Sequence, residues 1–206
     1  VLFRSANNAL EIATLEDIGE IGVVTPHLMA NIAAATAMAR SAGVEPDRIR
    51  QAIREFRLDA HRIESVAEAN GVRWIDDSKA TNPHAANASL ASFESVVWIV
   101  GGLLKGVDIS DLVERYAPRI KTAIVIGKDR QPVLHALTAR APEVNVIEIS
   151  DGDLVMHEAV KAALSVAESG DVVLLAPAAA SMDQFKDYED RGNSFAEQVR
   201  IQLETI

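Results

Sequence analysis

The chain has 206 residues, of which 49% are hydrophobic and 24% are charged, a balance typical of a globular protein. The formal net charge of −10 argues against a broad nucleic-acid-binding surface, which needs a basic field, and the absence of cysteine excludes disulfides and thiolate metal sites. There is no apolar run long enough to span a membrane and no secretory signal. We therefore expect a cytoplasmic monomer that binds neither nucleic acid nor membrane.

The N-terminal part of the sequence contains two helical patterns. Residues 7–22 show little periodicity. Residues 26–44 are rich in alanine, leucine and methionine, which favour a helix, and residues 45–56 predict a second helix with proline and aspartate in its first turn. The pattern changes after these helices, so we predict a domain boundary that separates residues 1–60 from residues 61–206.

From residue 61 onward, strand patterns alternate with helix patterns. The dipeptide Asn70-Gly71 predicts a tight hairpin between two strands. Further strands are predicted at residues 95–102, 122–127, 144–149 and 171–177, and helices from Pro83, near Ser110–Tyr116, after Asp129, at residues 153–169 and from about Asn193. Continuous runs of valine, isoleucine and leucine indicate an α/β fold, with a doubly wound, mostly parallel sheet and helices on both faces. Such sheets bind ligands beyond the carboxyl ends of their strands, so the segments after each strand hold the candidate site residues.

Polar side chains are crowded into the segment "DSKATN", which follows the strand pattern "VRWI". Asp77 could hold a ribose or a cation, Lys79 could meet a phosphate or a carboxylate, and Thr81 could hydrogen-bond an acidic substrate. Alternatively, Thr81 or Asn82 caps the following helix while the lysine and the aspartate are solvated. Capping explains one of these groups and not all of them, so we favour a functional role.

Two further polar segments follow predicted strands. In "IVGGLLKGVDIS", Lys105 lies between glycines on a short loop, although by itself it would be taken for a surface lysine. In "LLAPAAASMDQFKDYEDRGNSF", Ser181 begins a polar and aromatic segment whose backbone N–H groups could bind a carboxylate. His61 and Arg62 lie at the predicted domain boundary, where an arginine can stack on adenine or pair with phosphate, although such a pair is more often structural.

Several motifs that would indicate other chemistry are missing. The sequence contains no G-x-x-x-x-G-K-[ST] phosphate loop, no G-x-G-x-x-G dinucleotide turn, no G-x-S-x-G nucleophile elbow and no H-E-x-x-H metal motif. The polar segments above therefore remain the candidates for a functional site.

The segments "PHLMANIAAA", "HR", "DSKATN", "GGLLKGVD" and "APAAASMDQFKDYEDRG" resemble, in this order, the C-terminal part of the Mur ligase family, and within it the ligases that add D-glutamate in peptidoglycan synthesis. The resemblance runs from about Ala9 to the C-terminus. "DSKATN" together with "SMDQFK…RG" is specific within the family, whereas the sister ligases that add a diamino acid carry a D-N-P-R motif that is absent here. The resemblance implies a Rossmann-like domain at residues 61–206, preceded by a helical remnant of a central ATP-binding domain at residues 1–60.

The resemblance also implies a role for each matching residue. D-glutamate would be bound by Thr81, Lys105, Ser181, the backbone near Met182, and Tyr188, at a position where the family usually has phenylalanine. The nucleotide would be bound by Asn31, Arg62 and Asp77. His61 would lie close to the phosphates and Lys79 would face the nucleotide, and these two are the implied catalytic residues.

The implied reaction is an ATP-dependent ligation in two steps. ATP phosphorylates the carboxylate of UDP-N-acetylmuramoyl-L-alanine to an acyl phosphate, and the amine of D-glutamate then displaces phosphate to form an amide. Mg²⁺ and lysine would neutralise charge during both steps. The family's phosphate loop, Mg²⁺ ligands and UDP-binding domain would lie upstream of residue 1, so we expect this chain alone to be inactive.

Two other functions stay open at the level of sequence. The C-terminal domain could be a stand-alone module that binds an amino acid or a nucleotide without chemistry, and an upstream phosphate loop in the same reading frame would exclude this. The chain could also come from a related Mur or folylpolyglutamate-type ligase. "DSKATN" disfavours that alternative, because the sister groups vary at this turn.

Overall fold

The structure, a computed structural model, describes residues 2–5, 8–19 and 21–205. The chain divides into two compact units, Val1–Asp59 and Ala60–Ile206. This division lies one residue before the boundary expected from the sequence. In the part of the chain that the structure describes, no helix is both long and apolar enough to cross a lipid bilayer.

The first unit is a small helical unit with a short hairpin. Its elements are β1 (Leu2–Ser5), β2 (Asn8–Glu11), α1 (Leu15–Gly19), α2 (Pro26–Ser41) and α3 (Pro46–Glu55), and β1 pairs with β2 in antiparallel fashion. Thr25 caps α2, because its hydroxyl accepts the N–H of Leu28 at 3.2 Å, and Pro26 occupies the first turn. A buried apolar cluster forms its core, made of Ile12, Ala13, Ile18, Ile21, Leu28, Ile32, Ile49 and Ile53.

The sequence analysis predicted α2 and α3 but not the hairpin or α1. Strands β1 and β2 are each four residues long, which is too short for a two-residue hydrophobic period to stand out from chance. Helix α2 also ends three residues earlier than predicted, because Gly43 adopts a φ of +83° just beyond it.

The second unit contains a six-stranded sheet with the order β3-β4-β8-β5-β6-β7. Its strands are β3 (Glu64–Ala69), β4 (Val72–Asp76), β5 (Val96–Gly101), β6 (Ile120–Ile126), β7 (Asn145–Glu148) and β8 (Val172–Leu175). Strands β3 and β4 are antiparallel and all other pairs are parallel. The hairpin between β3 and β4 turns at Asn70 and Gly71, which both have positive φ, as the Asn-Gly signal predicted.

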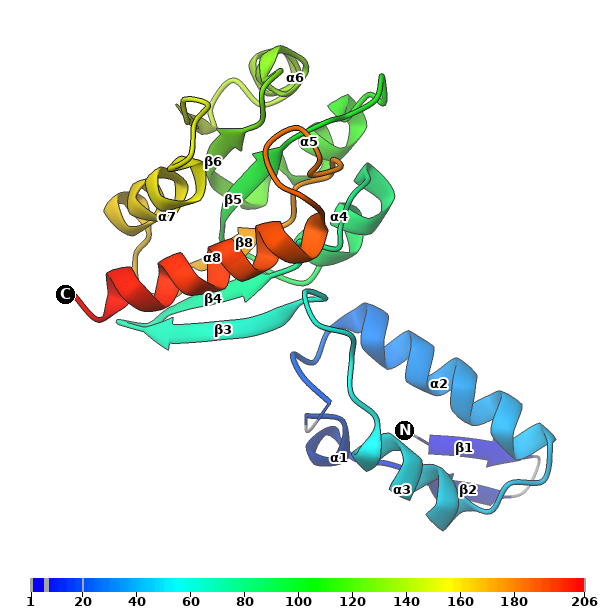
Figure 1. Cartoon of the computed structure of the whole chain (residues 1–206). Coiled ribbons are helices and arrows are strands. Elements are labelled where there is room, and N and C mark those ends of the chain that lie inside the picture. Colours follow the sequence, from blue (N-terminus) through cyan, green and yellow to red (C-terminus); the bar gives the residue numbers. More distant parts are fainter. Residues whose placement is uncertain (1, 6–7, 20, 206) are drawn as a thin grey trace. The chain divides into compact units, whose positions relative to one another are not determined.

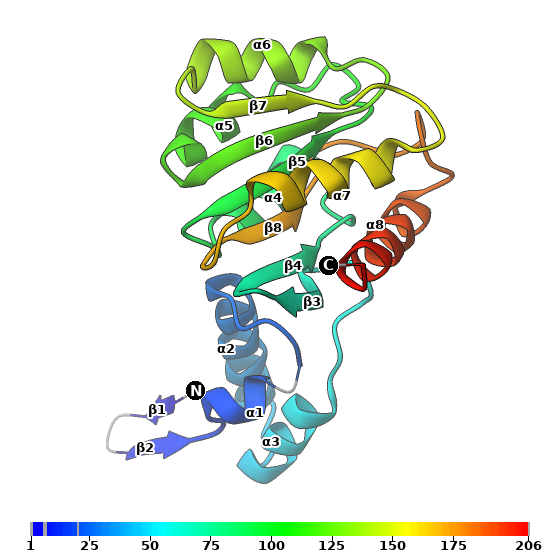
Figure 2. The same ribbon diagram turned by 90° about the vertical axis from the view of Figure 1, so that its left-hand side faces the viewer.

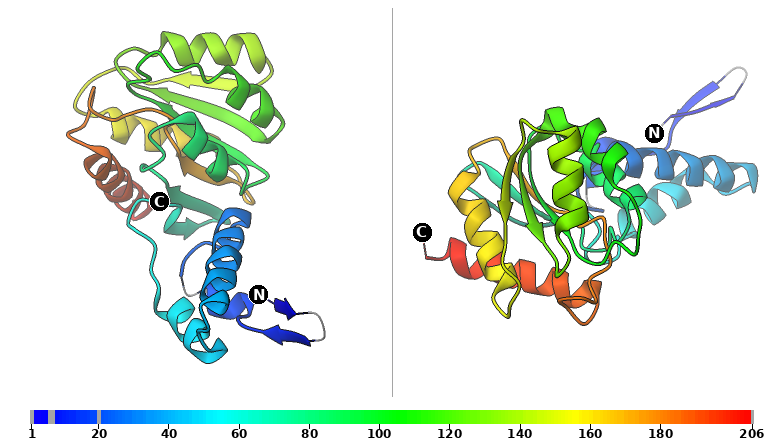
Figure 3. Two further views of the ribbon diagram at one scale, coloured as in Figure 1. Left: turned by 90° about the vertical axis from the view of Figure 1, so that its right-hand side faces the viewer. Right: turned by 90° about the horizontal axis from the view of Figure 1, so that it is seen from above.

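Helices cover both faces of this sheet, as predicted. They are α4 (Pro83–Leu90), α5 (Ser110–Tyr116), α6 (Gln131–Arg140), α7 (Val155–Val166) and α8 (Tyr188–Leu203), and a short 3₁₀ turn, η1, spans Ala117–Arg119. Helix α8 packs on β3 and β4, and α7 packs beside it on β5 and β6 (Figures 1 and 2). The left panel of Figure 3 shows the side opposite to that of Figure 2. In it, the green helices α4, α5 and α6 lie in front of the sheet and the red helix α8 lies behind it.

The core under α7 and α8 combines alternate residues of the strands with the inner faces of the two helices. Trp74 of β4 and Phe195 of α8 are fully buried there, with ring centroids 6.4 Å apart. Aromatic pairs of this kind contribute about 0.5–1.5 kcal/mol beyond the burial of their area. This packing fixes the first half of α8 against the end of β4, where the candidate site begins.

Two element boundaries in this unit differ from the prediction. Helix α8 starts at Tyr188 and not near Asn193, because the carboxylate of Asp187 accepts the N–H of Asp190 at 2.8 Å and caps a turn that the sequence analysis assigned to a loop. Strand β8 ends at Leu175, two residues before the predicted end at Pro177, where the chain leaves the sheet.

Candidate functional site

The turn after β4 is the most buried part of the candidate site. Asp76, Asp77 and Ser78 have exposed fractions of 1%, 5% and 0%. The N–H of Asp77 donates to the carbonyl of Leu175 at 2.8 Å, and the N–H of Ser78 donates to Oδ1 of Asp76 at 2.8 Å. The chain therefore leaves the sheet in a conformation that hydrogen bonds fix residue by residue.

Asp77 is buried and bonds to α4. Its carboxylate accepts the N–H of Ile63 at 3.3 Å and a short hydrogen bond from the hydroxyl of Ser89. Burial raises the pKa of Asp77 to about 6, although the hydrogen bonds from Ser89 and Ile63 and the charge of Arg62 act in the opposite direction. A carboxylate with this pKa changes its charge near neutral pH.

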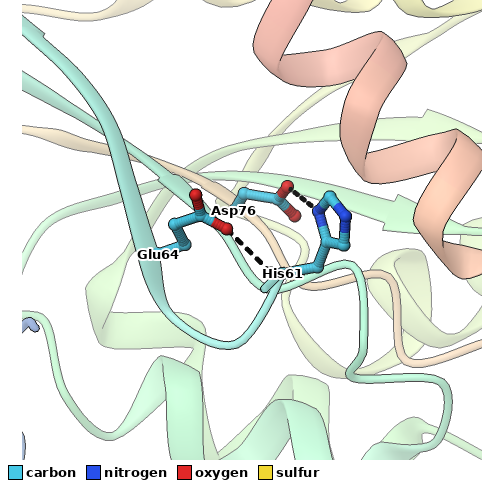
Figure 4. Close-up of side chains that lie close together, drawn as sticks. All are labelled: His61, Glu64 and Asp76. Atoms are coloured by element: carbon cyan, nitrogen blue, oxygen red, sulfur yellow. Dashed lines mark hydrogen bonds and ion pairs between the residues drawn. The ribbon is translucent and has the colours of Figure 1, made fainter. Parts of the chain in front are cut away.

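His61 forms a buried pair with Asp76 (Figure 4). The imidazole Nδ1 lies 2.7 Å from Oδ2 of Asp76, and the backbone N–H of His61 donates to Oε2 of Glu64 at 2.8 Å. Burial raises the pKa of Asp76, and the bond to His61 opposes this shift. The contact fixes the orientation of the imidazole ring, whose edge faces Tyr188 with the ring centroids 6.3 Å apart.

The same three side chains have the spacing of a possible metal site. The potential ligand atoms of His61, Glu64 and Asp76 lie within 4.8 Å of one another. However, Nδ1 of His61 and Oδ2 of Asp76 already bond to each other, and Glu64 already accepts a backbone N–H. Mg²⁺ prefers an all-oxygen, octahedral shell with several waters, so a cluster with one nitrogen ligand, in which His61 and Asp76 are buried, does not fit it.

Lys79 and Thr81 continue this turn. The N–H of Lys79 donates to the carbonyl of His61 at 3.1 Å, and its ammonium lies 5.6 Å from the centroid of the Tyr188 ring. The N–H of Thr81 donates to the carbonyl of Lys79 at 2.9 Å. Helix α4 is capped by Asn82, whose Oδ1 accepts the N–H of Ala85 at 2.9 Å. Capping therefore accounts for Asn82 and leaves Thr81 without that structural role.

The loop after β5 meets the segment after β8 edge to edge. The N–H of Leu103 donates to the carbonyl of Ala180 at 2.8 Å, and the N–H of Ala180 returns to the carbonyl of Leu103 at 3.1 Å. Gly102 has a φ of +125°, and a Cβ added there would meet the carbonyl oxygen of Ala180 at 2.5 Å, so only glycine fits. Lys105 follows on the exposed part of this loop with a φ of +55°.

The segment after β8 is held at several points. Ser181 is 3% exposed, and its carbonyl accepts the N–H of Phe185 at 2.9 Å, whereas Met182 is 60% exposed. Oδ2 of Asp183 accepts the N–H of Lys128 at 3.0 Å, which joins this segment to the loop after β6. A buried serine beside an exposed methionine leaves the segment with a fixed backbone and an accessible surface.

Arg191 of α8 lies beneath these loops and is fully buried. Its guanidinium donates to the carbonyl of Ser78 at 2.9 Å, to the hydroxyl of Ser78 at 3.0 Å and to the carbonyl of Ala179 at 3.2 Å. Burial lowers its pKa to about 10, and the charges of Asp183 and Asp76 oppose this shift. The side chain therefore stays protonated at neutral pH and bonds two loops at once.

Most of the residues predicted for the site lie on the second unit. His61 and Arg62 precede β3, and the segments after β4, β5 and β8 hold Asp77, Lys79, Thr81, Lys105, Ser181, Met182 and Tyr188. These strands are neighbours in the sheet, and their carboxyl ends lie on one edge. Asn31 lies on α2 of the first unit, where its amide contacts His27 at 3.2 Å.

The sequence analysis missed the residues beneath this surface, which are Asp76, Arg191 and Gly192. One signal for Arg191 was present, because Arg191, Phe195 and Val199 are spaced four residues apart and share the buried face of α8. A charged residue on a buried helix face needs a polar partner. That pattern could have identified Arg191 but not the loops that it binds.

Known proteins are similar to this chain in sequence. The family described as Mur ligase, glutamate ligase domain, matches residues 61–179. The UDP-N-acetylmuramoylalanine–D-glutamate ligase of Leifsonia xyli subsp. xyli is 53% identical over 191 residues, which are 92% of this chain and 37% of that protein. The ligase of the same name from Thermobifida fusca is 50% identical over 193 residues, which are 93% of this chain and 41% of that protein. The chain thus spans about two fifths of the length of the curated relatives it matches.

Solved structures show the same fold. The UDP-N-acetylmuramate-alanine ligase of Thermotoga maritima has a TM-score of 0.60 at 17% identity and covers 88% of this chain and 39% of its own. A murein peptide ligase from Psychrobacter arcticus has a TM-score of 0.54 at 16% identity and covers 90% of this chain and 38% of its own. These structures confirm the predicted α/β fold, and the family match confirms the resemblance on which the site was predicted. The chain therefore belongs to the Mur ligase family, whose glutamate ligase domain it contains.

Proposed function

We propose that this chain is the C-terminal part of an ATP-dependent ligase that joins D-glutamate to UDP-N-acetylmuramoyl-L-alanine in peptidoglycan synthesis. One observation carries the proposal. The loops after β4, β5 and β8, which hold the residues that match the D-glutamate-adding ligases, meet at one edge of the sheet through the Leu103–Ala180 pairing and the bonds of Arg191. The names of the relatives that are about half identical to this chain support the same activity and disfavour a folate-type ligase.

The amino-acid site needs cations and hydroxyl donors, because D-glutamate brings two carboxylates. Lys105 on the exposed loop after β5 supplies an ammonium, and Thr81 and Ser181 supply hydroxyl groups from the neighbouring loops. Charge-assisted hydrogen bonds to carboxylates are about twice as strong as neutral ones. In this assignment, the backbone near Met182 and the ring of Tyr188 complete the amino-acid site.

The nucleotide would lie on the other side of the turn after β4. Asp77 and Arg62 would hold it, and Lys79 and His61 would lie close to its phosphates. Asn31 on α2 stays a predicted nucleotide-binding residue. The γ-phosphoryl group passes to a carboxylate oxygen of the acceptor and ADP leaves, and the amine of D-glutamate then attacks the acyl carbon, loses a proton and releases phosphate. The residues of this chain would act by positioning and by neutralising charge.

Mg²⁺ is implied by the family, and its chemistry would be to neutralise the phosphate oxygens. The cluster of His61, Glu64 and Asp76 does not fit this ion, for the reasons given above. We therefore assign the Mg²⁺ ligands to the upstream part of the parent enzyme and assign no step to an ion in this chain. In consequence, the isolated chain is expected to bind substrate without turnover.

Calorimetric titration of the chain with D-glutamate and L-glutamate tests the proposal. We expect binding that favours the D-enantiomer and that falls about fivefold to a hundredfold in Lys105→Ala and in Thr81→Ala, since each removes a charged or polar contact worth about 1–3 kcal/mol. Lys128→Ala is the matched control, because Lys128 is an exposed lysine on the loop after β6 at the same edge of the sheet. Equal binding of both enantiomers, or equal losses in all three variants, would contradict the proposal.

A further inference from the structure

The loops that form the proposed amino-acid site come from distant parts of the chain, and one side chain bonds two of them and lies close to the third. We propose that Arg191 is a positioning residue that sets the spacing of the amino-acid site by holding the loops after β4, β5 and β8 together without touching the substrate. The inference rests on the proposed function for what the loops bind, but the holding of the loops is a separate claim that can be measured by itself.

The first two loops are joined by direct hydrogen bonds. Arg191 Nη2 and Nε donate to the carbonyl and the hydroxyl of Ser78 at 2.9 and 3.0 Å, and Nη1 donates to the carbonyl of Ala179 at 3.2 Å. The hydroxyl of Ser78 in turn donates to the carbonyl of Tyr188 at 2.7 Å. The start of α8, the turn after β4 and the segment after β8 thus form one hydrogen-bonded unit around the guanidinium.

The third loop is linked to Arg191 through the segment after β8. A Cβ added to Gly102 would lie 3.4 Å from Arg191 Nη1 as well as 2.5 Å from the carbonyl oxygen of Ala180. The loop after β5 therefore lies close to the guanidinium, and the Leu103–Ala180 pairing joins it to the segment after β8 that Arg191 bonds. Lys105 follows two residues after that pairing.

The positions of the proposed ligands follow from these contacts. Lys79 and Thr81 lie one and three residues after Ser78, and Ser181 lies two residues after Ala179. Over such short backbone distances, a displacement at the anchor moves the ligand-binding group with it. Misplacement of a binding group by about 1 Å is enough to cost a large factor in substrate recognition.

The guanidinium is suited to this task because it is planar and presents several N–H donors in fixed directions. Lysine carries the same charge but cannot donate to two separated carbonyls and a hydroxyl in one plane. If Arg191 only filled the core, an apolar side chain that continued the stripe of Phe195 and Val199 would serve, since replacing a buried charge by an apolar residue is often neutral or stabilising. The arginine is therefore explained by what it bonds.

The test compares Arg191→Ala and Arg191→Lys with the unchanged chain. In Arg191→Ala we expect D-glutamate to bind at least about tenfold more weakly, and low-millimolar guanidinium to restore most of the affinity by filling the vacated space, whereas equal concentrations of sodium do not. Arg191→Lys keeps the charge and the bulk, folds, and is expected to stay weak in binding. Arg200→Ala is the matched control, because Arg200 lies on the same helix but is exposed.

A second readout needs no ligand. Amide hydrogen exchange at Leu103 and Ala180, which bond to each other, and at Thr81, which bonds to Lys79, should become faster in Arg191→Ala and Arg191→Lys, return with guanidinium, and stay unchanged in Arg200→Ala. If the unchanged chain binds no D-glutamate, the proposed function fails, and the exchange rates still decide whether Arg191 holds the loops. Wild-type affinity in Arg191→Ala, or a loss of affinity without faster exchange in these loops, would overturn the inference.

Discussion

At the scale of single residues, the ionisation of Asp77 makes the stability of the folded chain depend on pH. Its pKa is raised from 3.8 to about 6, chiefly by burial. Between about pH 4 and pH 6 the folded chain therefore binds a proton that the unfolded chain does not, so stability falls as the pH rises through this window and the penalty is fully present above it. The shift corresponds to a penalty on the order of 2–3 kcal/mol at pH 8.

Asp77→Asn should remove this penalty. We expect the variant to be more stable than the unchanged chain at pH 8 and the difference to vanish near pH 4, because the wild-type carboxyl is then protonated and resembles the amide. Urea denaturation at a series of pH values measures this. Glu143→Gln, in an exposed turn before β7 of the same unit, is a control for the loss of one negative charge. A variant that is less stable than the unchanged chain at pH 8 would refute the account.

Helix α8 approaches the His61–Asp76 pair so closely that position 192 requires glycine. A Cβ at this position would lie 2.2 Å from Nδ1 of His61 and 2.7 Å from Oδ2 of Asp76. Replacing a helical glycine by alanine ordinarily stabilises a helix by about 0.5–1 kcal/mol. Here we expect Gly192→Ala to lower the free energy of unfolding by about 1–3 kcal/mol, because the methyl group overpacks a buried site.

Thermal or urea denaturation measures the effect of Gly192→Ala, and the histidine ring resonances report whether the imidazole of His61 moves. Asn193→Ala is the neighbouring control, since Asn193 is exposed on the same helix turn and its replacement should be neutral or slightly stabilising. Equal stabilities in the two variants would contradict the close packing of α8 against His61.

At the scale of elements, two neighbouring residues at the start of α4 have different roles. Asn82 has a structural role, and Thr81 has a proposed binding role. Asn82 accepts the N–H of Ala85, so Asn82→Ala should destabilise the chain by about 1 kcal/mol, whereas Asn82→Asp keeps an acceptor and should not. Thr81→Ala should change stability by less than about 0.5 kcal/mol and reduce binding of D-glutamate instead. Denaturation curves and calorimetry on the same three variants check this. A large loss of stability in Thr81→Ala would indicate that Thr81 caps the helix instead.

The elements also show which boundaries local sequence can predict. Helix α4 begins where proline follows an asparagine cap, and the hairpin turns at Asn-Gly, so both were predictable. Helix α8 begins five residues earlier than predicted, although Asp187 and the N–H of Asp190 have the spacing of a cap. The polar first turn "YEDRG" hid this start, because its buried residue is an arginine and not an apolar side chain.

At the scale of the whole molecule, the two compact units differ in how much core they have. The first unit buries a small cluster of isoleucine, leucine and alanine, whereas the second buries a sheet on both faces. Small domains bury a smaller fraction of their surface and are correspondingly marginal. The first unit should therefore unfold at a lower urea concentration than the second.

Two spectroscopic probes test this expectation. Both tryptophans, Trp74 and Trp98, lie in the sheet of the second unit, so tryptophan fluorescence reports that unit, while far-ultraviolet circular dichroism reports the helices of both. The circular dichroism curve should show an earlier transition that fluorescence lacks, and a chain that begins at residue 60 should lose that transition alone. Coincident curves from the two probes would mean that the units unfold as one.

By itself, the sequence determined the α/β class, the parallel sheet, most helices and the segments that hold the proposed ligands, because hydrophobic periods, turn dipeptides and family motifs are local signals. Only the tertiary structure decided which groups support those segments. Ser78 and Arg191 are 113 positions apart in the chain, and the Leu103–Ala180 pairing joins loops after different strands. Contacts of this kind join residues that only the order of the strands and the packing of α8 bring together, so no local pattern encodes them.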